Sequence, residues 1–340
     1  MDNHLLISCQ PSAISRQQFC HAVNQPIFKI FFASSEEPTL ERVEIDHTKL
    51  DLMVIDPERR LPFGRPWLTT AVDIYTKSAL GIYLSFDPPS YLSVMQSLIH
   101  TITSKAYVQK KYPSIVNTWD TYGIMETLVP DNANEFICTH FEDACLQLGI
   151  VIQYAPPRLA WYKGSVERYF GTINRQLLHQ QPGTTFSNII DKADYDTKKN
   201  AIISMDTLLE IIHKWIIDIY HQQEHRGIKN TPAQAWKTAI EEFPPALPPN
   251  KRELEVLLGM IEERTVSAKG IELFGLFYNC DELLSLRLGQ KREKVKIKYD
   301  PTDISVIHAF DQFKGVFIPI PALDQSYTKE RLFRTMHGRG

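Results

Sequence analysis

Alternating apolar and polar positions predict a β-sheet in the first half of the chain. Val43 and Ile45 alternate with Glu44 and Asp46, which is the period of a half-buried strand. The apolar run at 52–55 is interpreted as a continuation of this strand. Further apolar runs, bounded by turn-forming residues, predict strands over 67–73, 81–86, 124–129 and 150–154.

Capping residues and apolar residues at helical spacing predict helices between and after these strands. Ser90 caps the first helix, Gly149 ends the second, and Thr231 caps the last, which begins at Pro232. The predicted helices cover residues 91–108, 141–148, a segment after 163–165, 208–220 and a segment from 232. Strands followed by alternating helices and strands indicate an α/β fold, a mixed sheet flanked by helices.

The second half of the chain has a different pattern. Residues 243–250 are rich in proline, which predicts an extended linker. Short strands at close spacing then predict a small all-β barrel, at 264–266, 270–273, 276–278, 295–299 and 304–307. We expect an N-terminal segment with a short helix at 15–23, a core, a linker, a barrel and a tail, over 1–40, 41–242, 243–252, 253–322 and 323–340.

Composition narrows the class of protein. No run approaches the roughly 20 apolar residues of a membrane span, and the N-terminus lacks the pattern of a signal peptide, so we expect a cytoplasmic protein without a membrane partner. Five scattered cysteines form no Cys-x-x-Cys pair, which argues against a zinc site or a disulfide framework. A formal net charge of −3 does not by itself indicate a DNA-binding protein. The formal net charge omits any bound metal cations, which would compensate the negative charge of acidic ligands.

Three acidic residues stand at positions that suit a metal site. Asp131 is the first polar residue after the apolar run that ends at Pro130, and Glu167 lies in the first turns of a predicted helix, with 35 residues between the two acids. Asp46, on the first strand, is a third carboxylate. Hard divalent cations prefer such oxygen ligands, so these three acids could hold two metal ions.

The segments that carry these acids resemble a known family. The sequences 45–48 (Ile-Asp-His-Thr), 130–136 (Pro-Asp-Asn-Ala-Asn-Glu-Phe) and 164–168 (Gly-Ser-Val-Glu-Arg) occur in the order found in the DDE transposase and retroviral integrase superfamily. They are most similar to Mu-like transposases of the TnsB and TniA type. The sequence 299–303 (Tyr-Asp-Pro-Thr-Asp) is similar to the C-terminal barrel of Mu-type transposases. The resemblance implies a ribonuclease-H-like core.

The resemblance also implies an activity and partners. The family cleaves DNA at transposon ends and transfers the 3′-hydroxyl ends into target DNA, using two Mg²⁺ ions for which Mn²⁺ substitutes. By this resemblance Asp46 bridges both ions, Asp131 holds one and Glu167 holds the other. Relatives act as homo-multimers on DNA, with an ATPase regulator and in some cases a partner endonuclease subunit.

Each acid also has a structural interpretation. Asp131 could be a turn residue, and Glu167 could interact favourably with the positive end of its helix dipole. Asp51, Asp56 and Asp73 lie near Asp46, and Asp73 is expected to make a structural hydrogen bond at the end of its strand. Ala133 stands where many relatives have glycine, which would cost stability if its φ is positive.

Two functions compete with transposition. Residues 1–40 leave no room for the helix-turn-helix modules that precede the core in the family, which would suit a non-catalytic DNA-binding or regulatory remnant. A stand-alone ribonuclease-H-like nuclease suits the core but leaves the barrel unexplained.

Two groups of basic residues are candidates for contact with DNA phosphates. The first surrounds Glu167, and the second alternates along one predicted strand, so its members point to one face. A solvated surface is the alternative for both groups, and Trp161 and Tyr162 could pack on a nucleotide or on the core. The candidates are Arg158, Lys163, Arg168, Arg175, Lys294, Lys296 and Lys298.

Overall fold

The computed structural model describes residues 39–156, 160–177, 203–283 and 294–324, and the structural statements below refer to these ranges. The short helix predicted at 15–23 and most of the predicted tail lie outside them. In these ranges, no helix combines the length and the apolar character needed to cross a membrane.

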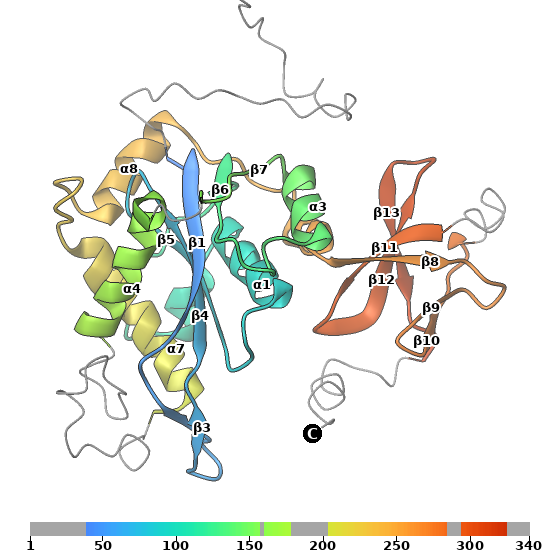
Figure 1. The fold of residues 1–340 in the computed structure, drawn as a ribbon, viewed down its shortest axis with the longest axis horizontal. Helices are drawn as coiled ribbons and strands as arrows, with labels where there is room; N and C mark the ends of the chain where they lie inside the picture. The colour runs from blue at the N-terminus through green and yellow to red at the C-terminus, as the bar shows by residue number, and fades with distance from the viewer. Residues whose placement is uncertain (1–38, 157–159, 178–202, 284–293, 325–340) are drawn as a thin grey trace, which may run out of the picture. The chain divides into compact units, whose positions relative to one another are not determined.

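A five-stranded mixed sheet forms the centre of the core (Figure 1), in the order β5-β4-β1-β6-β7. The central strand β1 pairs antiparallel with β4 and parallel with β6, and β5 and β7 complete the two edges. This confirms the predicted mixed sheet, although β6 and β7 are shorter than predicted. The strands are β1 (Arg42–Lys49), β4 (Trp67–Asp73), β5 (Ala79–Ser85), β6 (Thr127–Val129) and β7 (Val151–Ile152).

The prediction that residues 52–55 continue the first strand is wrong. Strand β1 ends at Lys49, and β2 (Val54–Ile55) pairs instead with β3 (Pro62–Gly64) in a separate hairpin. The chain leaves the sheet because Leu50 donates its N–H to Pro66 O at 2.9 Å and Arg65 Nε donates to Leu50 O at 2.8 Å. These contacts join the two ends of the hairpin.

The helices begin near their predicted caps, but two end earlier than predicted. Helix α1 (Tyr91–Ile102) stops before Thr103, whose hydroxyl donates to Ile99 O, and α2 (Tyr107–Lys111) is a separate short helix. Helix α7 (Met205–Lys214) passes into a π turn over Trp215–Ile219 and a 3-10 turn over Tyr220–Gln222. The predicted helix ends at Gly149 and Thr231 are confirmed, in α3 (Thr139–Leu148) and α8 (Pro232–Glu242).

The two faces of the sheet carry different helices (Figure 1). Helix α4 (Gly164–Gln176) and α7 pack with Leu68 and Val72 of β4 in one core cluster. Helices α1 and α3 pack with Val43 and Ile45 of β1 in another. Because side chains alternate along a strand, Glu44 and Asp46 face the α4 side of β1.

The C-terminal region is a separate antiparallel sheet, preceded by a helix, α9 (Lys251–Leu257), that was not predicted. Four strands lie in the order β13-β12-β11-β8, and a bridge between Tyr278 and Ala322 joins the β9-β10 hairpin to the end of β13. Strand β13 was also not predicted. The strands are β8 (Met260–Thr265), β9 (Ile271–Leu273), β10 (Leu276–Tyr278), β11 (Lys294–Asp300), β12 (Asp303–Asp311) and β13 (Val316–Pro321).

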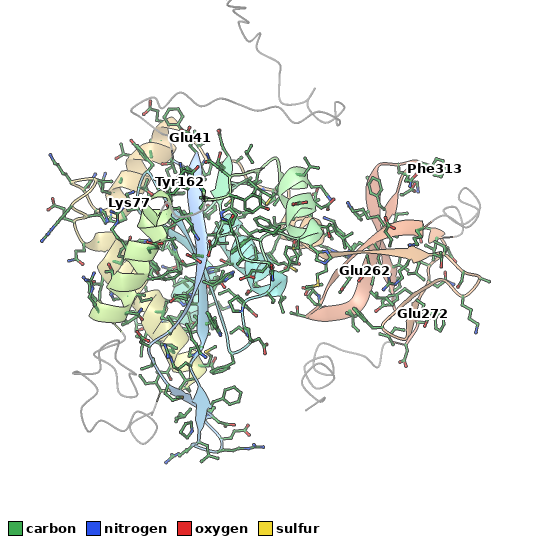
Figure 2. The ribbon with its side chains drawn as sticks, viewed as in Figure 1. Glu41, Lys77, Tyr162, Glu262, Glu272 and Phe313 are labelled. Atoms are coloured by element: carbon green, nitrogen blue, oxygen red, sulfur yellow. The ribbon has the colours of Figure 1, made fainter. Side chains whose placement is uncertain are left out.

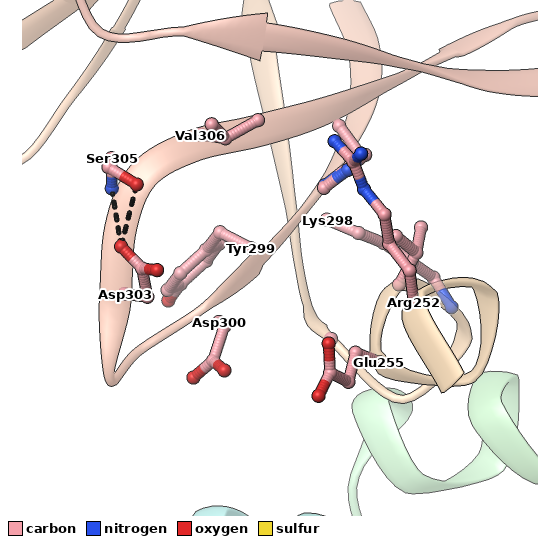
Figure 3. Close-up of a pocket in the computed structure, with 11 residues that line it drawn as sticks. Arg252, Glu255, Lys298, Tyr299, Asp300, Asp303, Ser305 and Val306 are labelled. Atoms are coloured by element: carbon pink, nitrogen blue, oxygen red, sulfur yellow. Dashed lines mark hydrogen bonds between the residues drawn. The ribbon is translucent and has the colours of Figure 1, made fainter. Parts of the chain in front are cut away.

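The Tyr-Asp-Pro-Thr-Asp sequence forms the tight turn between β11 and β12. Asp300 accepts hydrogen bonds from the N–H and hydroxyl of Thr302, and Asp303 accepts from the N–H and hydroxyl of Ser305 (Figure 3). Both aspartates line a cavity of about 220 Å³ together with Arg252, and their hydrogen bonds stabilise the turn between β11 and β12.

Candidate active site

Strand β1 places Asp46 on the face of the sheet that α4 covers. The neighbouring Val43 and Ile45 are fully buried in the opposite core, which fixes the direction in which Asp46 points. Asp46 Oδ1 accepts the N–H of His47 at 2.7 Å, and its Oδ2 faces Lys163.

The pairing of β6 with β1 places Asp131 just after the end of the strand that neighbours the strand of Asp46. The two strands are parallel, and their last registered pair is Glu44 with Val129. Asp46 lies two residues further along β1, and Asp131 lies two residues past the end of β6. Asp131 is exposed, and its Oδ1 accepts the N–H of Asn132 at 2.7 Å.

Glu44 fixes the start of α4 over β1, a role that the sequence did not reveal. Its Oε2 accepts the N–H groups of Ser165 at 2.9 Å and Val166 at 2.7 Å, and the residue is 2% exposed. Burial raises the pKa of this carboxyl, and the two N–H groups partly oppose the rise. The signal available in the sequence was an acid that shares a strand face with Asp46.

Lys163 forms an ion pair with Asp46. Its Nζ lies 2.9 Å from Asp46 Oδ2, and the residue is only 6% exposed. Glu167 follows four residues later, so it lies on the same side of the helix, about one turn along. Glu167 is exposed and has no hydrogen-bond or ion-pair partner in the part of the chain that the structure describes.

The three carboxylates are suitable ligands for a divalent cation, although their side chains do not converge on one point in this structure. Within the described ranges, no three or more His, Cys, Asp or Glu side chains are close enough to form a metal site. Asp46 nevertheless already holds a cation, the ammonium group of Lys163. Asp131 and Glu167 add exposed oxygen donors of the kind that Mg²⁺ prefers.

His47 and Glu135 connect β1 to the segment that follows Asp131, and the sequence did not indicate this contact. His47 Nδ1 lies 2.7 Å from Thr69 Oγ1, and Nε2 lies 3.5 Å from Glu135 Oε1. Its ring stacks on Phe136 at a centroid distance of 4.9 Å. Burial, helped by the charge of Lys163, lowers the pKa of His47 to about 4, so the ring is neutral at pH 7.

The aspartates that compete with Asp46 make other contacts. Asp73 is fully buried and accepts from Leu40 N and from the N–H and hydroxyl of Thr76, which confirms its predicted structural hydrogen bonding. Asp51 pairs with Arg65 at 2.6 Å. Asp56 accepts two N–H groups in the hairpin turn.

Ala133 causes no backbone strain. The described non-glycine residues with positive φ are Leu40, Arg60, Lys77, Lys229 and Phe274, and Ala133 is not among them. The expected cost of replacing glycine at this position therefore does not arise in this structure.

The predicted DNA-contacting residues lie in different surroundings. Arg158 is outside the described residues, Lys163 is buried on Asp46, and Arg168 and Arg175 are exposed on α4. Lys294 is exposed, whereas Lys296 and Lys298 on the same strand both pair with Asp143 of α3.

Tyr162 packs on the protein. The guanidinium group of Arg42 lies 4.3 Å from the centre of its ring, beside the start of β1 (Figure 2). The side chain of Trp161 lies outside the described part of the chain.

Two family models match the chain. Residues 44–183 match the TnsB C-terminal domain, and residues 255–319 match the C-terminal domain of Mu transposase. The transposase for transposon Tn552 of Staphylococcus aureus is 29% identical over 273 residues, which cover 79% of this chain and 52% of that protein. The Tn7 transposition protein TnsB of Escherichia coli is 25% identical over 292 residues, 80% of this chain and 42% of that protein. The chain thus spans about half the length of these relatives or less.

Solved integrase structures align with the chain at low TM-scores. The catalytic core domain of BIV integrase aligns with a TM-score of 0.33 and 13% identity, over 59% of this chain and 97% of that one. A simian T-cell lymphotropic virus intasome chain aligns with a TM-score of 0.38 and 15% identity, over 83% of this chain and 76% of that one. Because these scores are low, the sequence matches carry the comparison.

Proposed function

The chain belongs to the Mu-like transposases of the TnsB type, and from this premise we propose that it is the catalytic subunit of a DNA transposase. It would cleave DNA at transposon ends and transfer the 3′-hydroxyl ends into target DNA. Residues 41–242 would form the catalytic domain, 243–252 a linker and 253–322 a domain that contacts DNA.

The proposal assigns the reaction to Asp46, Asp131 and Glu167. These carboxylates would hold two Mg²⁺ ions, for which Mn²⁺ can substitute. When bound, the ions activate the attacking oxygen and stabilise the leaving oxygen of an in-line displacement at phosphorus. Lys163 would give up Asp46 to the incoming ion, and His47 with Glu135 would keep the Asp131 segment against β1.

The observation that supports this assignment most strongly is the register of β1 and β6 together with the position of α4. Asp46 lies on β1 and Asp131 lies two residues past the end of the neighbouring parallel strand β6, and the hydrogen bonds from Ser165 and Val166 to Glu44 hold the start of the Glu167 helix over β1. These contacts support the proposal that the three carboxylates come together when the two metal ions bind.

The substrate and partners follow the same premise. We propose DNA as the substrate, both transposon ends and target, with phosphates bound by the exposed Arg168 and Arg175. A homo-multimer on DNA, an ATPase regulator and a partner endonuclease subunit are proposed from the family alone.

The test is a joining reaction with purified protein. Precut DNA ends of its own transposon are incubated with target DNA and Mg²⁺, and joined products are quantified. We expect Asp131→Asn to reduce joining by at least about a thousandfold, since a metal-coordinating carboxylate is lost. Asp56→Asn, which changes an acid of the β2-β3 hairpin, serves as the control and should join DNA normally.

One observation favours a second candidate, a non-catalytic DNA-binding protein. Lys163 forms an ion pair with Asp46, and the acids in the described ranges do not form a group that could hold a metal ion. Binding of end DNA without any metal-dependent joining by the wild-type chain would support that function and contradict the first.

A further inference from the structure

A cavity of about 740 Å³ lies along one face of α4, the helix that carries Glu167. Its walls come from three separate segments: α4, the turn after β4 that carries Lys77, and residues 220–227. Arg168, the residue directly after Glu167, belongs to its lining. Ser165, whose N–H binds Glu44 of β1, also lines the cavity and connects it to the strand of Asp46.

Positive charge dominates this cavity. Arg168 and Arg175 from α4, Lys77 and Arg226 line it, against one acid in the lining, Glu224. Within the described ranges, no carboxylate lies within ion-pairing distance of the three arginines. Burial lowers the pKa of His225, a further lining residue, and the nearby charges of Lys77 and Arg168 add to the decrease.

The walls are held in place before any ligand arrives. Tyr220 donates its hydroxyl to Lys77 O at 2.8 Å, and Lys77 Nζ donates to Ser165 Oγ at 3.0 Å. Opposite them, His225 and Asn230 close a tight turn with Arg226 at its tip. Lys77, fixed in this way, loses little entropy when it contacts an anion.

We infer that this cavity binds the phosphodiester backbone of a single DNA strand at the edge of the active site, an inference that rests on the proposed function. A cavity of this volume admits one strand, whereas a duplex with its two grooves does not fit inside. Tyr169 and Tyr220 are 1% and 9% exposed and offer no ring for stacking, so the contacts are with phosphates and are independent of sequence.

The test measures binding without metal, by fluorescence anisotropy of a labelled single-stranded oligonucleotide in EDTA at several salt concentrations. Arg226→Ala should weaken binding about fivefold, the loss of one charge-assisted contact. The slope of log affinity against log salt should fall by about 0.7, as expected for one phosphate of a single strand. Lys229→Ala removes an exposed charge from the same turn but outside the cavity, and should change the affinity less than twofold.

Three outcomes would overturn the inference. Equal loss in both variants indicates a general surface charge effect, and loss on a duplex of the same length but not on the single strand indicates a duplex surface. Full displacement of the strand by inorganic phosphate at constant ionic strength indicates a simple anion site. None of these results alters metal-dependent joining or its dependence on Asp131, so failure of this inference and failure of the proposed function remain distinguishable.

Discussion

Two groups of basic residues, one on α4 and one on β11, have similar sequence patterns but different surroundings. Arg168 and Arg175 are exposed, line a cavity and have no carboxylate partner in the described ranges. Lys298 of β11 has a side chain that is 1% exposed, lies 2.9 Å from Asp143 and also donates to Leu257 O. The first group is available to an anionic ligand, and the second already has a partner within the protein.

The difference shows what spacing predicts and what it leaves open. Seven residues along a helix, or two along a strand, put side chains on one face. Only the tertiary fold decides whether that face meets solvent or another element. For Lys296 and Lys298 that element is α3, about 150 residues away in the sequence.

The largest effect is expected on stability. Asp143→Ala leaves the buried Lys298 without its carboxylate, and removal of one partner of a buried ion pair costs about 3 kcal/mol of unfolding free energy. Urea denaturation measures the change. Glu142→Ala, which removes an exposed acid of the same helix, should alter stability by less than about 0.5 kcal/mol. Equal losses in the two variants would show that the contact with Asp143 contributes nothing special.

The next largest effect is expected in the pH dependence of stability, to which Lys298 of β11 contributes. Burial lowers the pKa of Lys298 from 10.5 to about 8, against the opposing effect of Asp143. Between these values the unfolded chain binds the proton more readily, so the Lys298 contribution makes stability rise with pH over this window. Relative to Lys298→Met, the wild-type protein should gain about 2 kcal/mol of unfolding free energy from pH 8 to 10.5. Parallel curves for the two proteins would contradict the lowered pKa.

For the α4 arginines we expect a loss of DNA binding with almost no loss of stability. Together, Arg168→Ala and Arg175→Ala should weaken DNA binding on the order of twentyfold, since two charge-assisted contacts are lost. Unfolding free energy should change by less than about 0.5 kcal/mol. Lys110→Ala with Lys111→Ala removes the same charge from α2 and is the matched control in anisotropy measurements. Destabilisation without loss of binding would place the arginines in a structural role.

The smallest effect is expected at Lys294. Its side chain is 64% exposed and lies 3.9 Å from that of Glu263, a contact of little energetic value. Lys294→Ala should leave unfolding free energy within about 0.5 kcal/mol of wild type and reduce DNA affinity about twofold, as one screened contact would. A loss of stability as large as that of Asp143→Ala would mean that all of β11 is structural.

The strands of the core were largely predictable because one face of each is buried. Val43 and Ile45 point into the α1 side with no exposed surface, and this alternation placed Asp46 on the α4 side. The caps at Gly149 and Thr231 were predictable for a local reason, since each satisfies hydrogen bonds of its own helix. The β2-β3 hairpin was not, because Leu50 and Arg65 meet only after the chain turns back.

The candidate site was predictable in its residue types but not in its contacts. Asp46, Asp131 and Glu167 were singled out by their motifs, but Lys163 on Asp46 joins residues 117 positions apart. The contact of Glu44 with Ser165 spans 121 positions. Such pairs leave no periodic signal, so the ion pair and the helix anchor appear only in the folded chain.

The central claim is that Asp46, Asp131 and Glu167 form one divalent-cation site, and calorimetric titration with Mn²⁺ tests it most directly. Asp46→Asn, Asp131→Asn and Glu167→Gln should each weaken Mn²⁺ binding to the DNA-bound protein at least about tenfold, whereas Asp56→Asn should bind as the wild type does. Wild-type affinity in the three variants, or the same loss in Asp56→Asn, would contradict the claim.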